Sequence, residues 1–205
     1  MKSNNEMIKP LDAVRIRTGG RNHRVRKAVL EAAKEILVYE GIFGLTHRNI
    51  AQRAGVNAST VYRRWPDRHR LIADVLSSTA EDLIQIPNTG NLREDLMQFL
   101  LAIVSMLSSP IGLKLSQGCV TALASADDVV RDTITNLWKD RFQQTEIIFK
   151  RAERRGEKYP TLIEPQVLME MLIAPLWFRT LITSMPVDEA FLAKNINALF
   201  SFDSN

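Results

Sequence analysis

Apolar residues recur at helical spacing along nearly the whole chain after residue 22, and no stretch alternates between apolar and polar positions as a half-buried strand does. The helical pattern is interrupted at glycine, proline and capping residues, which divide it into about nine segments. No segment repeats another. The pattern therefore predicts an all-α protein of about nine helices.

The first third of the chain holds two unusually short helical segments. After a first helix over about 24–40, one segment is capped by Thr46 and ends at Gly55, and the next covers 58–64 behind Asn57. Helices this short are not stable alone in water. Two of them at a fixed angle, with polar and basic residues on the second, form a helix-turn-helix, whose second helix fits the major groove of DNA.

The helices predicted for the remainder of the chain are longer. They cover the segment after Pro66, which is capped by Asp67, and then 92–107, 110–124, 127–155, 165–184 and 188–202. The segment 165–184 has almost no polar face, so most of its surface must be covered. We expect it and the last helix to pair with their symmetry mates as a four-helix homodimer interface, and complete burial within one subunit is the alternative. The expected interface residues are Leu168, Leu172, Leu176, Leu181, Phe191, Ile196 and Leu199.

The net charge of +4 hides an asymmetry between the two parts of the chain. Residues 1–70 carry 15 Lys/Arg and 6 Asp/Glu, whereas residues 71–205 carry 12 Lys/Arg and 17 Asp/Glu. A basic front third on an acidic body suggests contact with a polyanion, and a solvated basic face is the alternative. The sequence thus predicts three parts: a flexible basic arm over 1–22, a helix-turn-helix domain over 23–70 and a larger helical body over 71–205.

Composition also bears on the compartment. The single cysteine excludes an intramolecular disulfide, and the first ten residues lack the apolar core of a signal peptide. The most apolar stretch, 167–182, is short and interrupted by Glu170, Pro175 and Arg179. We therefore expect a cytoplasmic protein that does not associate with a membrane.

Residues 29–71 resemble the N-terminal DNA-binding domain of the TetR family of bacterial transcriptional regulators. The matching positions are Ala32-Ala33, Gly41, Phe43, Thr46, Arg48, Ile50-Ala51, Ala54-Gly55-Val56, Thr60, Tyr62, Trp65 in the usual Phe place, Arg68 and Leu71. The remaining helices resemble that family's ligand-binding and dimerisation domain. The resemblance implies a dimer that binds double-stranded DNA at a palindromic operator, most often as a repressor.

Candidate DNA contacts follow from the helix-turn-helix and from this resemblance. Ser59, Thr60, Tyr62, Arg63 and Arg64 can project from the second short helix. The resemblance implies that Thr60 and Tyr62 contact phosphates, and that Ser59 and Arg63 face base edges. The remaining candidates for backbone contacts are Thr46, Arg48 and Arg68, together with Arg24, helped by Arg21 and Arg26.

The resemblance further implies a pocket for a small-molecule effector, whose binding shifts the spacing of the two DNA-binding heads. The candidate lining residues are Met97, Leu101, Met106, Cys119, Trp138, Phe142, Trp177 and Arg179. Ordinary core packing is the alternative for each. Arg179, a cation in an apolar helix, needs a partner such as a subunit acid or a ligand anion. Cys119 is either a redox sensor or, more simply, a buried thiol.

Other function classes find little support in the sequence. His23, His47 and His69 all fall in the DNA-binding third, and there is no Cys/His metal spacing, phosphate-binding glycine loop or nucleophile elbow. We therefore expect no catalytic residue, no metal site and no cofactor. An activator, a regulator without an effector and a helical protein-protein adaptor stay open as alternatives.

Overall fold

The computed structural model describes residues 18–124 and 128–201, apart from the side chains at 18–21, 122, 129 and 130. Within these residues the chain forms nine α-helices and no strand, which confirms the predicted all-α class. The helices are α1 (Thr18–Glu40), α2 (His47–Arg53), α3 (Ala58–Arg64), α4 (Arg68–Leu83), α5 (Leu92–Ser108), α6 (Pro110–Leu123), α7 (Asp128–Arg154), α8 (Pro165–Trp177) and α9 (Glu189–Phe200). Two short segments have other helical forms, the 3-10 turn η1 (Ile42–Gly44) and the π-helical η2 (Phe178–Thr183).

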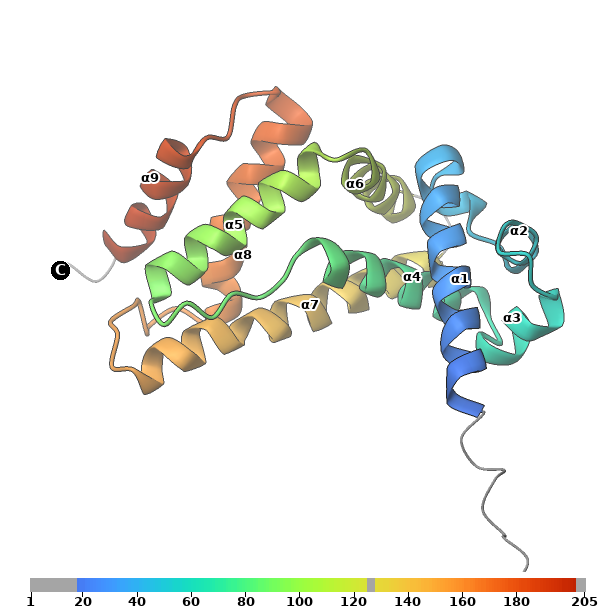
Figure 1. Ribbon diagram of the computed structural model, residues 1–205. Coiled ribbons are helices and arrows are strands. Elements are labelled where there is room, and N and C mark those ends of the chain that lie inside the picture. Colours follow the sequence, from blue (N-terminus) through green and yellow to red (C-terminus); the bar gives the residue numbers. More distant parts are fainter. Residues whose placement is uncertain (1–17, 125–127, 202–205) are drawn as a thin grey trace, which may run out of the picture.

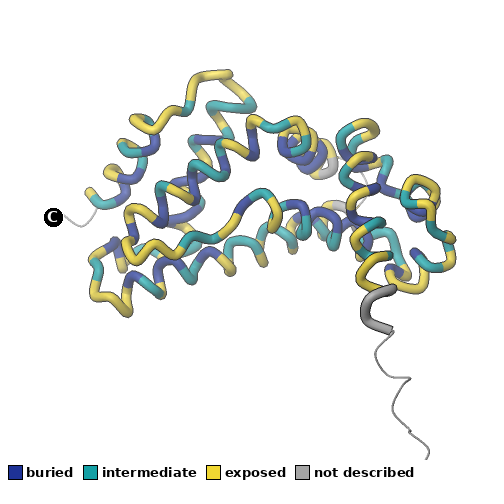
Figure 2. Tube along the Cα trace, in the orientation of Figure 1, coloured by how far each residue is buried: buried dark blue, intermediate teal, exposed yellow. Residues whose placement is uncertain are grey.

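The helices form an elongated molecule with a small head at one end (Figure 1). The head consists of α1, α2, α3 and the first part of α4, while α5, α7, α8 and α9 form the body. Helix α4 packs along α7, and α6 lies against both α1 and α5. The buried surfaces of the helices face one another in both parts (Figure 2). The apolar interior is thus divided into a head core and a body core.

Helix α4 joins the two parts. Leu71, Ile72 and Val75 are fully buried in the head core, although the predicted domain boundary lies at residue 70. Further along, Ile84, the C-cap of α4, belongs to the body core. The predicted boundary therefore falls inside a continuous helix that extends from the head into the body.

Three predicted helix caps are confirmed by side-chain hydrogen bonds. Thr46 accepts from the amide of Asn49 at 3.2 Å at the start of α2, and Asp67 accepts from the amide of Arg70 at 2.8 Å at the start of α4. Asn57 accepts from the amide of Ser59 at 2.9 Å at the start of α3. Each bond satisfies a backbone donor that has no partner within the helix.

The start of the first helix differs from the prediction. Helix α1 begins at Thr18 rather than near residue 24, and it includes the Gly19-Gly20 pair, which falls within the flexible arm predicted over 1–22. Residues 1–17 of that arm, and the side chain of Arg21, lie outside the described part of the chain. Glycine costs about 1 kcal/mol in a helix interior. A tertiary contact offsets part of this cost, because Asn22 accepts a hydrogen bond from Arg64 of α3 at 2.8 Å.

The predicted helix 165–184 is interrupted. Helix α8 ends at Trp177, and the chain continues as the π-helical η2 until Ser184, which has a left-handed backbone with φ of 53°. Pro175 lies inside α8 and has no N–H to donate to the preceding turn. One backbone hydrogen bond of α8 is therefore absent in the turn just before η2.

The predicted dimer-interface residues are mostly wrong. Leu168, Leu172, Leu176, Ile196 and Leu199 are all buried within the subunit's own body core. Only Leu181 and Phe191 are partly exposed. The sequence offered no way to tell the two apolar faces of α8 apart, because a helix that is apolar all round has no periodic contrast. The outward face carries a separate set, which we name the apolar stripe: Val167, Met171, Phe178, Ile182 and Met185, exposed by 40%, 38%, 57%, 71% and 51%.

A sharp corner connects α5 to α6. A Cβ at Gly112 would lie 2.0 Å from the carbonyl oxygen of Met106, so only glycine fits there. The amide of Gly112 donates to the Ser109 hydroxyl at 3.0 Å, which caps the new helix.

Among the described helices, none alone is long and apolar enough to cross a membrane. Helix α5 and the start of α6 meet that criterion only together, as a pair bent by 85°.

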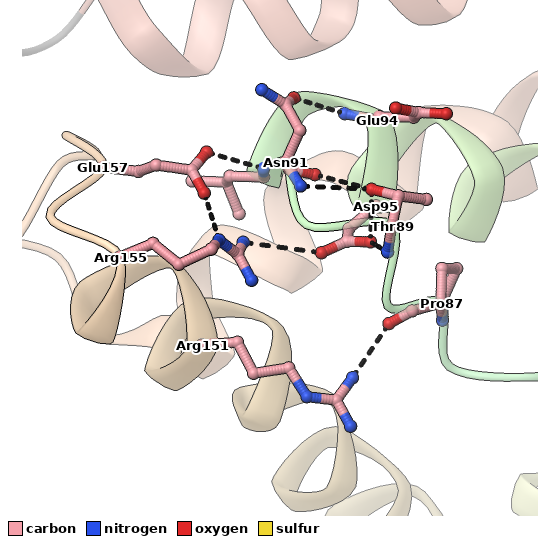
Figure 3. Close-up of polar contacts among 9 residues, drawn as sticks. Pro87, Thr89, Asn91, Glu94, Asp95, Arg151, Arg155 and Glu157 are labelled. Atoms are coloured by element: carbon pink, nitrogen blue, oxygen red, sulfur yellow. Dashed lines mark hydrogen bonds and ion pairs between the residues drawn. The ribbon is translucent and has the colours of Figure 1, made fainter.

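A polar cluster ties the end of α7 to the start of α5 (Figure 3). Asp95 is completely buried, and its Oδ1 accepts from the amide and the hydroxyl of Thr89 at 2.6 and 2.9 Å. Its Oδ2 lies 3.6 Å from Nη2 of Arg155. Glu157 accepts from the amide of Leu92 at 2.7 Å and from Arg155, and these bonds hold the pKa of its carboxyl below the usual value. The cluster thus fixes the end of α7 to the chain that follows α4.

An Arg155→Met substitution should lower the free energy of unfolding by about 3 kcal/mol, because it removes the cation beside a fully buried carboxylate. Urea denaturation measures this loss. Arg154→Met is the matched control, since Arg154 is the exposed preceding residue of the same helix. Equal midpoints for the two variants would contradict a stabilising role for the Arg155–Asp95 pair.

Candidate nucleic-acid interface and effector cavity

Helix α3 is seven residues long and is held in place from one side. Val61 is fully buried in the head core. Trp65, the C-cap residue of α3, is only 3% exposed there. The opposite side of α3 carries Ser59, Tyr62 and Arg63, all of which are exposed. A short helix with a fixed inner face and a polar, basic outer face has the form needed to enter a major groove.

Trp65 is anchored by an acid that the sequence alone did not reveal. Its indole Nε1 donates to Oδ2 of Asp74 at 3.0 Å, and the other oxygen of Asp74 accepts from Arg26 at 2.5 Å. A buried indole N–H needs such an acceptor. The pairing also shows that Arg26, a proposed helper of Arg24 at DNA, is engaged inside the head.

His47 is a second residue whose role the sequence did not reveal. Its ring stacks on that of Tyr62 with centroids 4.2 Å apart and planes 4° from parallel. The ring is buried, and Nε2 donates to the carbonyl oxygen of Trp65 at 2.7 Å. His47 of α2 thereby fixes the orientation of Tyr62 on α3. Tyr62 itself is 51% exposed. No local sequence signal indicates this contact, because it depends on the angle between the two helices.

A His47→Ala substitution should reduce operator affinity about tenfold and lower the free energy of unfolding by about 2 kcal/mol. The loss of stability combines a ring stack worth about 1 kcal/mol and a buried hydrogen bond worth about 1 kcal/mol. The loss of affinity follows because Tyr62 is no longer held in its orientation on α3. Mobility-shift titration and urea denaturation measure the two quantities. His47→Phe keeps the stack and should retain more of the affinity than His47→Ala. If the two variants bind equally weakly, the stack does not orient Tyr62.

The predicted DNA-contact residues fall into two groups. Arg24, Arg48 and Arg63 are exposed and make no hydrogen bond or ion pair with the described residues. Arg64 donates to Asn22 of α1, and its guanidinium lies 5.3 Å from the centre of the Trp65 ring. The first three are therefore available cations, whereas Arg64 also braces the end of α3.

Two further candidates have structural roles within the head. Arg68 is partly buried and donates to the carbonyl oxygens of Leu45 at 3.2 Å and Phe43 at 3.5 Å, so it ties the start of α4 to the η1 loop. Thr46 is the cap of α2. Of the remaining two, Thr60 is partly buried, and the hydroxyl of Ser59 donates to Oδ1 of Asn57 at 2.9 Å. Ser59 therefore presents hydrogen-bond acceptor capacity to the solvent.

A small apolar cavity of about 40 Å³ lies where the head meets the body. Four of the eight predicted pocket residues line it, namely Met106, Cys119, Trp138 and Trp177. The rings of Trp138 and Trp177 meet edge to face with centroids 5.5 Å apart. Burial raises the pKa of the Cys119 thiol to about 12, so this cysteine is a protonated, unreactive lining residue rather than a redox sensor.

The other four predicted pocket residues lie elsewhere. Met97, Leu101 and Phe142 are partly buried against the body core. Arg179 stacks over the Phe191 ring at 3.8 Å and donates to the carbonyl oxygen of Pro186 at 2.7 Å, so it joins η2 to α9. The cavity contains instead a cation that the sequence pattern did not single out, Arg141 of α7.

Two family models match this arrangement of a helix-turn-helix head and a helical body. A model for bacterial regulatory proteins of the tetR family matches residues 29–75. A model for the tetracyclin repressor-like C-terminal domain matches residues 86–199, which is more than half of the 205-residue chain. The chain belongs to the TetR family.

Individual TetR-family relatives agree with the family models. The chain is 26% identical over 172 residues to the uncharacterized HTH-type transcriptional regulator YdeS of Bacillus subtilis, covering 84% of this chain and 86% of YdeS. It is 32% identical over 138 residues to the HTH-type transcriptional regulator AqdR of Rhodococcus erythropolis, covering 67% of this chain and 65% of AqdR. Among solved structures, the TetR family transcription regulator SCO0332 superposes with a TM-score of 0.70 at 30% identity, over 87% of this chain and 97% of that one.

This TetR-family chain is therefore a DNA-binding transcriptional regulator of the helix-turn-helix type. The resemblance drawn from residues 29–71 is confirmed. The two matched segments leave 76–85 between them, which comprises the second half of α4, its C-cap Ile84 and the next residue. In TetR-family terms, α4 is the connection between the DNA-binding domain and the C-terminal domain.

Proposed function

We propose that the protein is a homodimeric repressor that binds a palindromic operator through α3 of each subunit and is released from it by a small-molecule effector. The observation that carries the DNA-binding half of this proposal is the outer face of α3, where Ser59, Tyr62 and Arg63 stand exposed on a helix fixed from behind. Arg63, exposed and unpaired among the described residues, reads a base edge. Arg24 and Arg48 contact the phosphate backbone on either side of it.

The apolar stripe supports the dimer. A large exposed apolar patch is uncommon on a monomeric soluble protein and marks an interaction surface. Phe178 and Ile182 are exposed by 57% and 71% and follow one another along the same side of η2. Two copies of the stripe, related by a two-fold axis, would cover each other and place two heads at a fixed separation. A symmetric pair of heads binds two half-sites about one helical turn, or a multiple of it, apart.

The cavity between the head and the body supports effector-controlled release. It is bounded by α4 and α6, which both contact head elements, so its filling shifts parts that position α3. Repression through operator occlusion fits this design. We further propose that residues 23–70 act as the DNA-binding unit, with α4 as its link, and that the protein works in the cytoplasm beside the DNA it regulates.

A mobility-shift titration with DNA from upstream of the protein's own gene tests the proposal, with a scrambled duplex of equal length as the control. We expect the upstream duplex to bind at least a hundredfold more tightly than the scrambled duplex. Specific sites typically bind about 10³–10⁷ times more tightly than non-specific DNA. DNase I footprinting should then protect an inverted repeat that overlaps a promoter. Equal binding to both duplexes would contradict operator recognition, and a footprint upstream of the promoter would favour an activator.

A further inference from the structure

Arg141 is the only cation that lines both the apolar cavity and a larger groove beside it, among the residues that the structure describes. The groove runs between α4 and α7, has a volume of about 290 Å³, and shares Ala80, Leu137 and Arg141 with the cavity. Arg141 thus stands at the opening between a solvent-facing groove and an apolar interior.

The hydrogen bonding of this guanidinium is incomplete. One Nη donates to the carbonyl oxygen of Ile84 and the other to Oε1 of Gln144 at 3.1 Å, while Nε is buried and has no partner among the described residues. Burial lowers the pKa of Arg141, and the charge of Glu81 on α4 opposes this shift. A charged donor that is buried without an acceptor carries a free-energy cost, which an anion placed against Nε would relieve.

We propose that this opening is the effector site and that the effector is a small apolar carboxylic acid whose carboxylate pairs with Arg141. The inference rests on the proposed effector-controlled function and names the chemistry of the ligand. A carboxylate can accept from Nε and one Nη together, which gives the bidentate geometry that suits a planar guanidinium. The apolar part of the ligand packs against Trp138 and Trp177.

The size of the site limits the ligand. The cavity of about 40 Å³ cannot hold an aromatic ring as it stands, but the adjoining groove of about 290 Å³ brings the site near the lower end of the ~300–1,000 Å³ typical of ligand pockets. Met106 lines the cavity and has a flexible side chain that can turn aside. A one-ring acid fits this space better than a multi-ring compound.

The same arginine also holds the end of α4. Ile84 is the C-cap residue of α4, and its carbonyl oxygen accepts from Arg141. A carboxylate that takes over an Nη of Arg141 competes with this bond. Since the first turns of α4 belong to the head core, loosening its last turn changes the support of the head.

Matched pairs of acids and amides test the ligand chemistry on the full-length protein. The probes are benzoate, phenylacetate and 3-phenylpropionate, each compared with its primary amide by isothermal titration calorimetry. We expect at least one acid to bind ten times more tightly than its amide. Arg141→Met should reduce the acid to the affinity of the amide, and Arg141→Lys, which keeps the charge but lacks the planar fork, should retain part of the preference.

Arg151→Met is the control for an indirect effect, in which loss of an arginine merely loosens the connection between α4 and α5. Arg151 donates to the carbonyl oxygen of Pro87 at 2.9 Å in the same connection, but it lines neither the cavity nor the groove. It should leave the acid preference unchanged. A preference that disappears equally in the Arg141 and Arg151 variants would overturn the inference, as would three acids that bind no better than their amides.

Operator binding, measured with and without the best acid, separates this inference from the proposed function. If operator binding is intact but no acid is preferred, the assignment of Arg141 fails while the DNA-binding function stands. If an acid is preferred through Arg141 but leaves operator affinity unchanged, Arg141 binds carboxylates but the opening is not an effector site, and effector-controlled release fails.

Discussion

A Phe178→Glu variant should sediment as a monomer at micromolar concentration and bind the operator at least a hundredfold more weakly than the natural protein. Phe178 lies at the centre of the apolar stripe, and 57% of its surface is exposed in the subunit. In the proposed dimer this surface is covered by its symmetry mate, so a glutamate would place two like charges close together in an apolar interface. Without the second head, the advantage of linked binding at two half-sites disappears, which is about 10²–10⁴ in affinity.

Leu162→Glu is the matched control for this effect. Leu162 is 98% exposed but does not belong to the stripe, so its replacement should leave both the dimer and operator binding unchanged. Analytical ultracentrifugation gives the assembly state, and a mobility shift gives the affinity. A Phe178→Glu variant that remains dimeric would show that η2 is not the dimer interface.

An Arg63→Ala variant should bind its operator about 5- to 150-fold more weakly and bind random DNA nearly as well as before. The range corresponds to the about 1–3 kcal/mol that a bidentate arginine contributes against a wrong base. Arg63 suits this role because it is exposed on α3 and has no partner among the described residues that would hold it back. Preference at one base position of each half-site should relax, which a panel of singly substituted operators measures.

Two comparisons separate base reading from general attraction. Arg48→Ala should weaken binding to all sequences alike and lower the salt dependence by about 0.9 for each phosphate that the protein no longer neutralises. Arg53→Ala should change neither, because Arg53 pairs with Glu35 and Glu40 within the head. An Arg63→Ala variant whose affinity falls equally for operator and random DNA would contradict its assignment to a base edge.

Local chemistry explains why so much of the head could be predicted. Thr46, Asn57 and Asp67 cap their helices through bonds to residues two or three positions away, and such short-range bonds leave a clear sequence signature. Fold class and helix-turn-helix identity follow from these signals together with helical periodicity.

Contacts between distant residues explain the errors. Arg141 reaches a carbonyl 57 positions away and Arg64 reaches Asn22 across 42 positions, so neither partner leaves a mark on the local sequence. The outward face of α8 was mistaken for the inward one because both faces are apolar. Arg179 is predicted to line the pocket, but it pairs instead with the carbonyl oxygen of Pro186. Arg68 also has a partner inside the protein, and its predicted contact with the DNA backbone stays a prediction.

Gly118 gives the molecule a mechanical property. On α6, a Cβ at this position would lie 3.3 Å from Cβ of Ile42 in η1, so the backbone of α6 packs directly against the Ile42 side chain of the head. The neighbouring Cys119 faces the cavity. Close-packed atoms resist compression steeply, and the β-branched side chain of Ile42 has little rotamer freedom with which to move aside. The contact between α6 and η1 is therefore stiff, so a displacement of α6 at the cavity would be passed to the head with little of it absorbed at this contact.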